Sequence, residues 1–305
     1  MHKKKIDTYK IDNFSIKTKH LDKLYWAELG ITKKDLMDYY AEISTYILPF
    51  LKNRPLTLHY FPYGIHRFSF YKRNFDYNVS NDFINTYEYK EKTQEKVMHV
   101  PVVNNRAGLV YLASRGCLEL HAWAVTYPDF EHPDIAVFDL DISSKTNFSK
   151  VVEVANILND RLLSLKIKSY VKTSGSTGMH VYVPLNPIYS FEKVRNWVKN
   201  IGEELSKKYP NLITTIQEQR KSHSGDKVVI DFLQNAITRN TAIPYTPRAN
   251  VEARISAPLL WDEVRKGNFS PSDFTMKNIL KRISKIGNPF KDILNTRQDI
   301  FPSII

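Results

Sequence analysis

Residues 136–143, with the sequence AVFDLDIS, close an apolar run with two aspartates that are one residue apart. The apolar residues predict a mostly buried strand, and the alternation of side chains along a strand places Asp139 and Asp141 on the same face. Two carboxylates this close repel each other, more strongly away from water. A divalent cation usually offsets such repulsion, so the stretch predicts a metal site, although two ordinary strand-end aspartates are the alternative.

Two further stretches contain groups that such a site needs. TSGSTGMH, residues 173–180, predicts a turn between strands whose glycines and hydroxyls direct donors toward an anion, and an ordinary β-turn is the alternative. In VVIDFLQN, residues 228–235, Asp231 lies in an apolar strand, where a carboxylate is costly unless it is metal-bound, ion-paired or turned to solvent. Three carboxylates and a phosphate-binding turn suit phosphoryl transfer with two ions, and oxygen ligands favour Mg²⁺ or Mn²⁺.

The composition narrows the class of protein. The 305 residues contain 44 Lys and Arg against 32 Asp and Glu, a formal net charge of +12 that suits nucleic acid, an anionic membrane or a phosphorylated ligand. With Cys117 as the single cysteine, an internal disulfide and a zinc site built from cysteines are excluded. Neither a secretory signal nor a membrane-spanning apolar run is present, so we expect a soluble, cytoplasmic protein.

Helical and strand patterns interleave along the chain, which predicts a mixed α/β or α+β fold in one domain, residues 1–305. Residues 30–50 predict a helix that Thr32 caps and Pro49 closes, and residues 105–120 predict another helix. Residues 56–75 predict paired strands, residues 85–100 a loop or hairpin, and residues 227–234 a strand.

These stretches also carry a family resemblance. KTSGSTGMHVYVPL (172–185), IDFLQN (230–235), IPYTPRANVEARISAPLLWDEV (243–264) and HLDKLYWAELGITKKDLMDYY (20–40) resemble the polymerase domain of bacterial DNA ligase D. That domain belongs to the archaeo-eukaryotic primase superfamily and works in non-homologous end joining. The similarity extends from about residue 21 to about residue 290. It implies a primase-type core of central mixed or antiparallel sheets flanked by helices, with an N-terminal helical region (1–60) and a catalytic core (61–305).

The resemblance implies a role for individual residues. The metal-binding catalytic residues would be Asp139, Asp141 and Asp231. The nucleotide-binding residues would be His121, Ser174, Gly175, Thr177, Gln234 and Arg248. The DNA-binding residues would be Lys23 and Lys33 at a downstream 5′-phosphate, Phe70 and Tyr71 stacked on the template, and the adjacent Lys72 and Arg73.

The resemblance therefore implies a nucleotidyltransferase with two Mn²⁺ or Mg²⁺ ions. It would add nucleotides, preferably ribonucleotides, to a 3′ end at gaps or double-strand breaks that carry a 5′-phosphate. Nucleoside triphosphates would be its substrates, a ligase and the Ku end-binding protein its partners, and the nucleoid its location. With no ligase lysine motif in these residues, the chain is expected to be either a stand-alone protein or part of a fused ligase.

The sequence departs from the family pattern at three places. Thr177 stands where the family often has a lysine, and Ile142-Ser143 stand where Pro-Gly is usual. The basic contact before the third aspartate could come from any of four residues, Arg220, Lys221, His223 and Lys227.

The sequence leaves two other functions as alternatives. A phosphatase of the haloacid-dehalogenase type also has an Asp-x-Asp motif, but usually near the N-terminus and with a threonine at the position of Ser143. A catalytically silent DNA-end-binding module would retain the basic surface, although three intact aspartates disfavour it.

Overall fold

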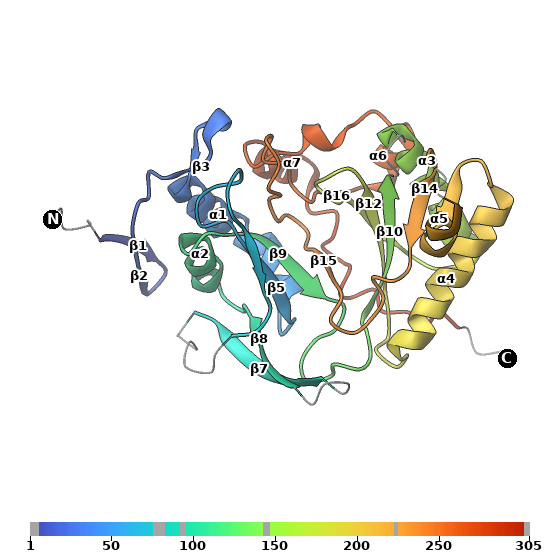
Figure 1. The fold of residues 1–305 in the computed structure, drawn as a ribbon, viewed down its shortest axis with the longest axis horizontal. Helices are drawn as coiled ribbons and strands as arrows, with labels where there is room; N and C mark the ends of the chain where they lie inside the picture. The colour runs from blue at the N-terminus through green and yellow to red at the C-terminus, as the bar shows by residue number, and fades with distance from the viewer. Residues whose placement is uncertain (1–5, 76–82, 92–95, 143–146, 223–224, 302–305) are drawn as a thin grey trace.

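Two β-sheets lie next to each other across the middle of the molecule, with helices around them (Figure 1). This arrangement confirms the predicted α+β class. The structure is a computed structural model, and it describes residues 6–75, 83–91, 96–142, 147–222 and 225–301. One hydrophobic cluster contains Leu58 of the smaller sheet and Phe138 of the larger one, so the two sheets share a core. Among the described residues, no helix is both long and apolar enough to cross a membrane.

The larger sheet contains the predicted Asp-x-Asp strand near its centre. Its order is β13, β14, β10, β12, β11 and β16, with bounds Ile213–Thr215, Val228–Asp231, Ile135–Ile142, Met179–Pro184, Tyr170–Thr173 and Pro258–Leu259. β13 and β14 are parallel and the other neighbours are antiparallel. The apolar run before Asp139 forms β10 because both faces of this strand are covered, as its buried residues show.

The smaller sheet is antiparallel and carries the aromatic segment. Its order is β15, β9, β5 and β6, with bounds Asn240–Ala242, Cys117–Trp123, Leu56–Tyr60 and Phe70–Lys72. Three antiparallel strand pairs complete the β structure: β1 with β2 (Asp7–Ile11, Phe14–Thr18), β3 with β4 (Leu24–Trp26, Ile31–Thr32) and β7 with β8 (Asn85–Glu91, Lys96–Val102). The last pair is the hairpin expected at residues 85–100.

The helices cover the outer sides of the sheets. Their bounds are Lys33–Leu51 (α1), Arg106–Ser114 (α2), Phe148–Ser164 (α3), Phe191–Lys208 (α4), Ile216–Ser222 (α5), Trp261–Lys266 (α6) and Ile279–Ile286 (α7), with 3₁₀ turns at Ala27–Leu29 and Pro271–Asp273. α1 and α2 pack together, and α2 also packs on β9. Trp197 of α4 packs edge-on against Phe138 of β10 at 5.5 Å. Because Phe138 alternates with Asp139, α4 covers the face opposite the aspartates.

Three sequence predictions of element ends are wrong. α1 continues past Pro49 to Leu51, because a proline this close to the end of a helix removes only one late hydrogen bond. The helix predicted over 105–120 ends at Ser114, since Gly116 takes a φ of +87°, which turns the chain into β9. β14 ends at Asp231, where the carboxylate accepts the N–H of Leu233 at 2.7 Å.

A buried ion pair fixes the connection between the two sheets. Arg54, between α1 and β5, donates to both carboxylate oxygens of Asp134, which precedes β10, at 2.7 Å each. The pair is almost fully buried, with exposures of 0% for Arg54 and 6% for Asp134. Loss of one partner would leave a buried, uncompensated charge, so the pair fixes the start of β10 relative to α1.

Candidate active site

Strand register brings the three predicted aspartates to one face of the larger sheet. Asp139 and Asp141 alternate with Leu140 on β10, so their side chains point to the same side. Asp231 of β14 pairs directly with Asp139 across the antiparallel ladder, so it faces that side as well. These three carboxylates are called the aspartate face below.

The electrostatics of the aspartate face fit a cation. Burial raises the pKa of Asp139 to about 6, and burial and the charges of Asp139 and Asp231 raise the pKa of Asp141 to about 7. The pKa of Asp231 is also raised, mainly by burial. Oδ1 of Asp139 is buried without a hydrogen-bond donor in good geometry. An orphaned buried carboxylate oxygen beside two further carboxylates is the donor set that a hard divalent cation requires.

A buried histidine and a buried lysine lie near Asp139, on the next two strands of the larger sheet. His180 of β12 pairs with Asp139 across the sheet, and its Nε2 lies 3.2 Å from Oδ1 without hydrogen-bonding geometry. Its Nδ1 lies 2.9 Å from Nζ of the fully buried Lys172, which also donates to Ser256 at 2.5 Å. Burial and the positive charges nearby hold the pKa of Lys172 and of His180 well below their ordinary values.

The predicted turn at residues 173–180 is present between β11 and β12 and is tightly built. The hydroxyl of Ser174 accepts the N–H groups of Ser176 and Gly178 at 3.1 Å each. Gly175 has a φ of +74°, and a Cβ there would lie 2.6 Å from Cγ of Arg248. A Cβ on Gly178 would lie 2.3 Å from the carbonyl oxygen of Leu140, on the strand of the aspartates. Both glycines therefore permit close approach, and they place the turn next to the aspartate face.

The segment around Arg248 holds this turn from the other side. Nη1 of Arg248 donates to the carbonyl oxygen of Ser174 at 2.7 Å, and Asn250 donates to that of Gly175 at 2.9 Å. Thr177 is exposed at the tip of the turn. At the edge of the aspartate face, Gln234 donates to Asp231 Oδ2 at 3.3 Å. Thus the turn at Ser174 and Gly175, Gln234 and Arg248 lie around one site that includes the aspartates.

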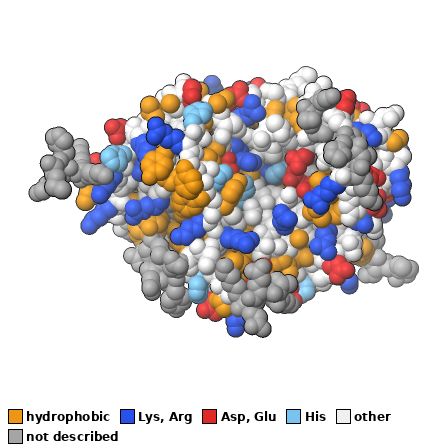
Figure 2. Space-filling model, viewed as in Figure 1, with side chains coloured by type: hydrophobic (Ala, Val, Ile, Leu, Met, Phe, Trp, Pro, Cys, Tyr) orange, Lys and Arg blue, Asp and Glu red, His pale blue; other side chains and the backbone are white. Residues whose placement is uncertain are grey.

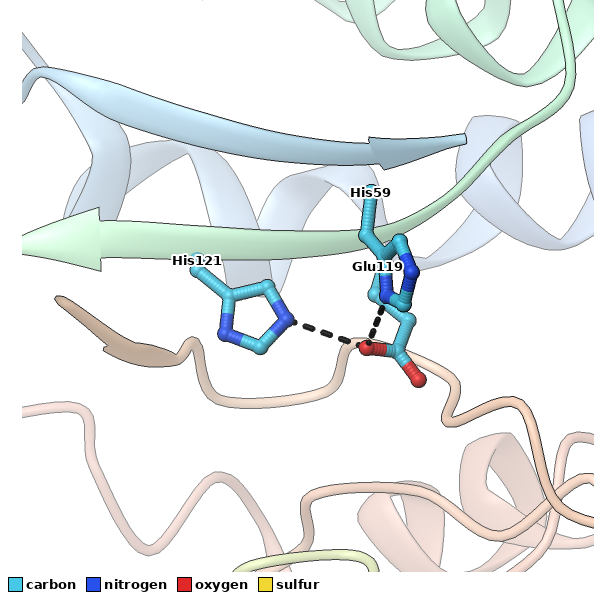
Figure 3. Close-up of side chains that lie close together, drawn as sticks. All are labelled: His59, Glu119 and His121. Atoms are coloured by element: carbon cyan, nitrogen blue, oxygen red, sulfur yellow. Dashed lines mark hydrogen bonds and ion pairs between the residues drawn. The ribbon is translucent and has the colours of Figure 1, made fainter. Parts of the chain in front are cut away.

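His121 belongs to a trio on the smaller sheet in which Glu119 and His121 are buried and His59 is partly buried. Its Nε2 lies 3.0 Å from Oε2 of Glu119, and Nδ1 of His59 lies 3.1 Å from the same oxygen, as Figure 3 shows. The atoms that the three residues could offer to a metal ion all lie within 4.8 Å of one another, so the trio is a candidate metal site. Within the described part of the chain, this trio and not the aspartate face meets that spacing.

The charges of the trio are set by its neighbours. Burial alone would raise the pKa of Glu119, but hydrogen bonds from His121 and His59 and the charge of Arg248 lower it below its ordinary value. Burial lowers the pKa of His121, which outweighs the opposite effect of Glu119. The site therefore contains an ionised Glu119 and a neutral His121 near neutral pH.

The predicted 5′-phosphate lysines lie together, with a third cation. Nζ of Lys33 donates to the carbonyl oxygens of Lys19 and Ser114 at 2.9 Å each, and Nζ of Lys23 donates to that of Pro62 at 2.6 Å. Burial and the charges of Lys23 and Arg115 lower the pKa of Lys33 to about 8. Three mutually repelling cations form a cluster that an anion would stabilise.

The predicted DNA-stacking residues are exposed on β6. The exposed fractions are 37% for Phe70 and 58% for Tyr71, so neither ring belongs to the core. Tyr71 stacks on His59 with ring centroids 3.8 Å apart, which connects this surface to the trio. Lys72 lies over the ring of Phe75 at 4.3 Å, and Arg73 is exposed. Hydrophobic and basic side chains gather on this part of the molecule, on the left half of the face in Figure 2.

Sequence analysis assigned no role to four residues of the site: His59, Glu119, Lys172 and His180. Glu119 lies in an apolar strand, as Asp231 does, and the cost of burying a carboxylate could have identified it. The others carry no comparable local signal, because their neighbours come from other strands. Among the open basic candidates before Asp231, His223 lies outside the described residues and the side chain of Lys221 is not described.

Comparisons with known proteins identify the family of this chain. The family model of the LigD primase-polymerase domain matches residues 32–290. The bifunctional non-homologous end joining protein LigD of Bacillus subtilis is 34% identical over 280 residues, which are 92% of this chain and 44% of the relative. The multifunctional non-homologous end joining protein LigD of Mycolicibacterium smegmatis is 27% identical over 270 residues, which are 88% of this chain and 34% of the relative. The chain thus spans less than half the length of these relatives.

A solved structure has the same fold. The polymerase domain of Mycobacterium tuberculosis ligase D, in complex with DNA, superposes with a TM-score of 0.83 at 24% sequence identity. The match covers 92% of this chain and 98% of that one. Together with the family model over residues 32–290, these findings show that the chain belongs to the LigD primase-polymerase domain family.

Proposed function

We propose that this chain is a template-guided nucleotidyltransferase that adds nucleotides to a 3′ end at gaps or double-strand breaks in DNA. The observation that carries the proposal is the aspartate face: three carboxylates of raised pKa, one with a buried oxygen that lacks a hydrogen-bond donor. Membership of a primase-polymerase family agrees with this chemistry and does not favour a phosphatase of the haloacid-dehalogenase type or a silent end-binding module.

Asp139, Asp141 and Asp231 are the proposed catalytic residues and ligands of two Mn²⁺ or Mg²⁺ ions. When bound, such ions lower the pKa of the attacking 3′-hydroxyl and neutralise charge on the triphosphate. The protein holds the carboxylates in place through the register of β10 and β14 and through the Leu233 N–H on Asp231. It also sets their protonation, because the raised pKa values make the empty carboxylates easy to protonate.

The proposed nucleotide site surrounds the aspartate face. Its residues are His121, Ser174, Gly175, Thr177, Gln234 and Arg248. Arg248 supports this assignment best, because its guanidinium touches the turn at Ser174 and its charge is felt by Asp139. A planar guanidinium suits the two oxygens of a phosphate. A preference for ribonucleotides is part of the proposal, by resemblance to the family.

The proposed DNA site has two parts. Lys23 and Lys33 would bind the 5′-phosphate downstream of a gap, and Phe70, Tyr71, Lys72 and Arg73 would bind the template. The cluster of positive charge around Lys33 and the exposed rings of β6 support these roles. A ligase and the Ku end-binding protein are the proposed partners, and the cytoplasmic nucleoid is the proposed location, since the relatives are named for non-homologous end joining.

Primer extension on a gapped duplex with a 5′-phosphate tests the proposal. We expect nucleotide addition that requires Mn²⁺ or Mg²⁺, stops with a chelator, and is measured with ribonucleotides and deoxynucleotides in parallel. Asp139→Ala should abolish it, whereas Asp160→Ala, at an exposed aspartate paired with Arg265, should not. Mn²⁺ binding followed by electron paramagnetic resonance should weaken in Asp139→Ala only. No metal-dependent addition by the wild type would overturn the proposal.

A further inference from the structure

Glu119 of β9 is a point at which three hydrogen-bonding groups and one ion-paired guanidinium meet. Its Oε2 lies 3.1 Å from Nδ1 of His59 and 3.0 Å from Nε2 of His121. Its Oε1 accepts the N–H of Ala249 at 2.7 Å and lies 3.2 Å from Nε of Arg248. The four groups come from two strands and from the segment after β15, so one carboxylate joins three separate parts of the chain (Figure 3 shows the histidine side).

We propose that Glu119 is the positioning residue of the nucleotide site, holding His121 and Arg248 in the orientation that receives the triphosphate. This inference rests on the proposed function. The two residues reach Glu119 from different directions: His121 is two residues away on the same strand, and Arg248 arrives from the segment that grips the turn at Ser174. Without Glu119, no other described contact would hold both of them to one point.

The burial of Glu119 explains why its effect should be large. The residue is 3% exposed, so its charge is compensated by protein groups and not by water. Nε of Arg248 is buried and has no hydrogen bond of good geometry, so the ion pair at 3.2 Å is the compensation available to it. Removing the carboxylate charge would leave this Nε without its ion pair and place an NH₂ donor where one carboxylate oxygen now faces these groups, and they would reorient.

A metal ion held by His59, Glu119 and His121 is the competing role for the same carboxylate. The ligand spacing permits it. Two observations favour positioning. Oε2 of Glu119 already contacts two imidazoles and Oε1 already accepts the N–H of Ala249, and the guanidinium of Arg248 lies beside Oε1, where it would repel a divalent cation. The two roles predict different spectroscopic results.

The test measures nucleotide binding and turnover in the full chain with Glu119→Gln, which keeps the size of the side chain and removes its charge. We expect the nucleotide KM and the directly titrated nucleotide Kd to rise about tenfold or more, the effect of one lost charge-assisted contact, while kcat changes by about threefold or less. Binding of gapped DNA without nucleotide should be unchanged. Glu119→Asp, which keeps the charge, should recover part of the affinity.

Two controls separate positioning from a loss of structure. Glu263→Gln removes a carboxylate that pairs with Arg282, remote from the site, and should leave KM and Kd unchanged. A long-range ¹⁵N spectrum of His121 should show protonated Nε2 in the wild type and a tautomer mixture in Glu119→Gln.

Three results would overturn the inference. The first is an unchanged nucleotide Kd in Glu119→Gln, and the second is a Glu119→Gln protein that loses DNA affinity and melting temperature along with nucleotide affinity. The third is a Co²⁺ absorption band that His59→Ala abolishes. The last would make Glu119 a metal ligand. Because Kd is measured without turnover, an inactive wild type would refute the proposed function and still leave this inference testable.

Discussion

Lys33 should make recognition of a 5′-phosphate depend on pH. Its pKa is lowered to about 8 by burial and by the charges of Lys23 and Arg115, with Asp7 acting weakly in the opposite direction. About nine tenths of the Lys33 side chains are therefore charged at pH 7 and about one tenth at pH 9. A bound terminal phosphate, a dianion above pH of about 6, restores the charge and raises this pKa. Above pH 8, the complex with 5′-phosphorylated DNA therefore holds more protons than the free protein. The affinity for this DNA falls as the pH rises, by at most about tenfold per pH unit.

The size of the preference follows from the donors that remain. Lys33 uses two of its three ammonium N–H groups on carbonyl oxygens, and Lys23 uses one of its three. The two lysines together therefore have three N–H groups left for a phosphate. Charge-assisted hydrogen bonds at a partly exposed site suggest a total of about 1–3 kcal/mol at low salt, which is about 5- to 150-fold in Kd. We expect gapped DNA with a 5′-phosphate to bind more tightly than the 5′-hydroxyl form by this factor at pH 7.

The assay is a titration of labelled gapped duplexes, with and without the phosphate, from pH 6.5 to 9.5 at two salt concentrations. Lys33→Arg should keep the preference and remove its fall above pH 8, because a guanidinium stays charged. Lys23→Ala combined with Lys33→Ala should erase the preference for the 5′-phosphate. In the wild type, this preference should become smaller as the salt concentration rises. Lys34→Ala, at an exposed neighbour paired with Asp38, is the matched control. Equal affinity of the wild type for both duplexes, or a preference that does not change with pH, would refute the reasoning.

Three further changes test other parts of the molecule. Asp139→Ala or Asp231→Ala should abolish primer extension and leave DNA binding nearly intact, and activity within a few-fold of wild type would remove that residue from catalysis. Arg248→Lys should raise the nucleotide KM more than it weakens DNA binding, because lysine cannot reproduce the planar fork; steady-state kinetics with an unchanged KM would contradict this. Asp134→Ala should lower the free energy of unfolding by about 3–5 kcal/mol in urea titrations, since it strands the buried Arg54, and a loss below about 1 kcal/mol would show that the charge finds another partner.

Local patterns were sufficient for the central strand and the first long helix. The apolar run before Asp139 predicts β10, and the period of two along a strand places Asp139 and Asp141 on one face without further information. Thr32 and Asp35 predict the start of α1, where they form the capping box that the structure contains. These features depend on neighbours within a few residues, so periodicity and capping chemistry determine them.

Contacts between distant segments were decided only by the tertiary structure. Asp231 is predicted as a buried carboxylate, but its position opposite Asp139 depends on the register of two strands that are far apart in the chain. His180 reaches Asp139 through the register of β12 on β10, whereas Arg248 reaches Glu119 from the segment between β15 and β16. Strand register is set by the packing of the core, because a shift of one residue would turn Asp231 or His180 to the other face of the sheet. The sequence by itself therefore determined the strand that carries Asp139 and Asp141 and the start of the first long helix, and only the tertiary structure brought in Glu119, Lys172 and His180 and decided which side chains meet.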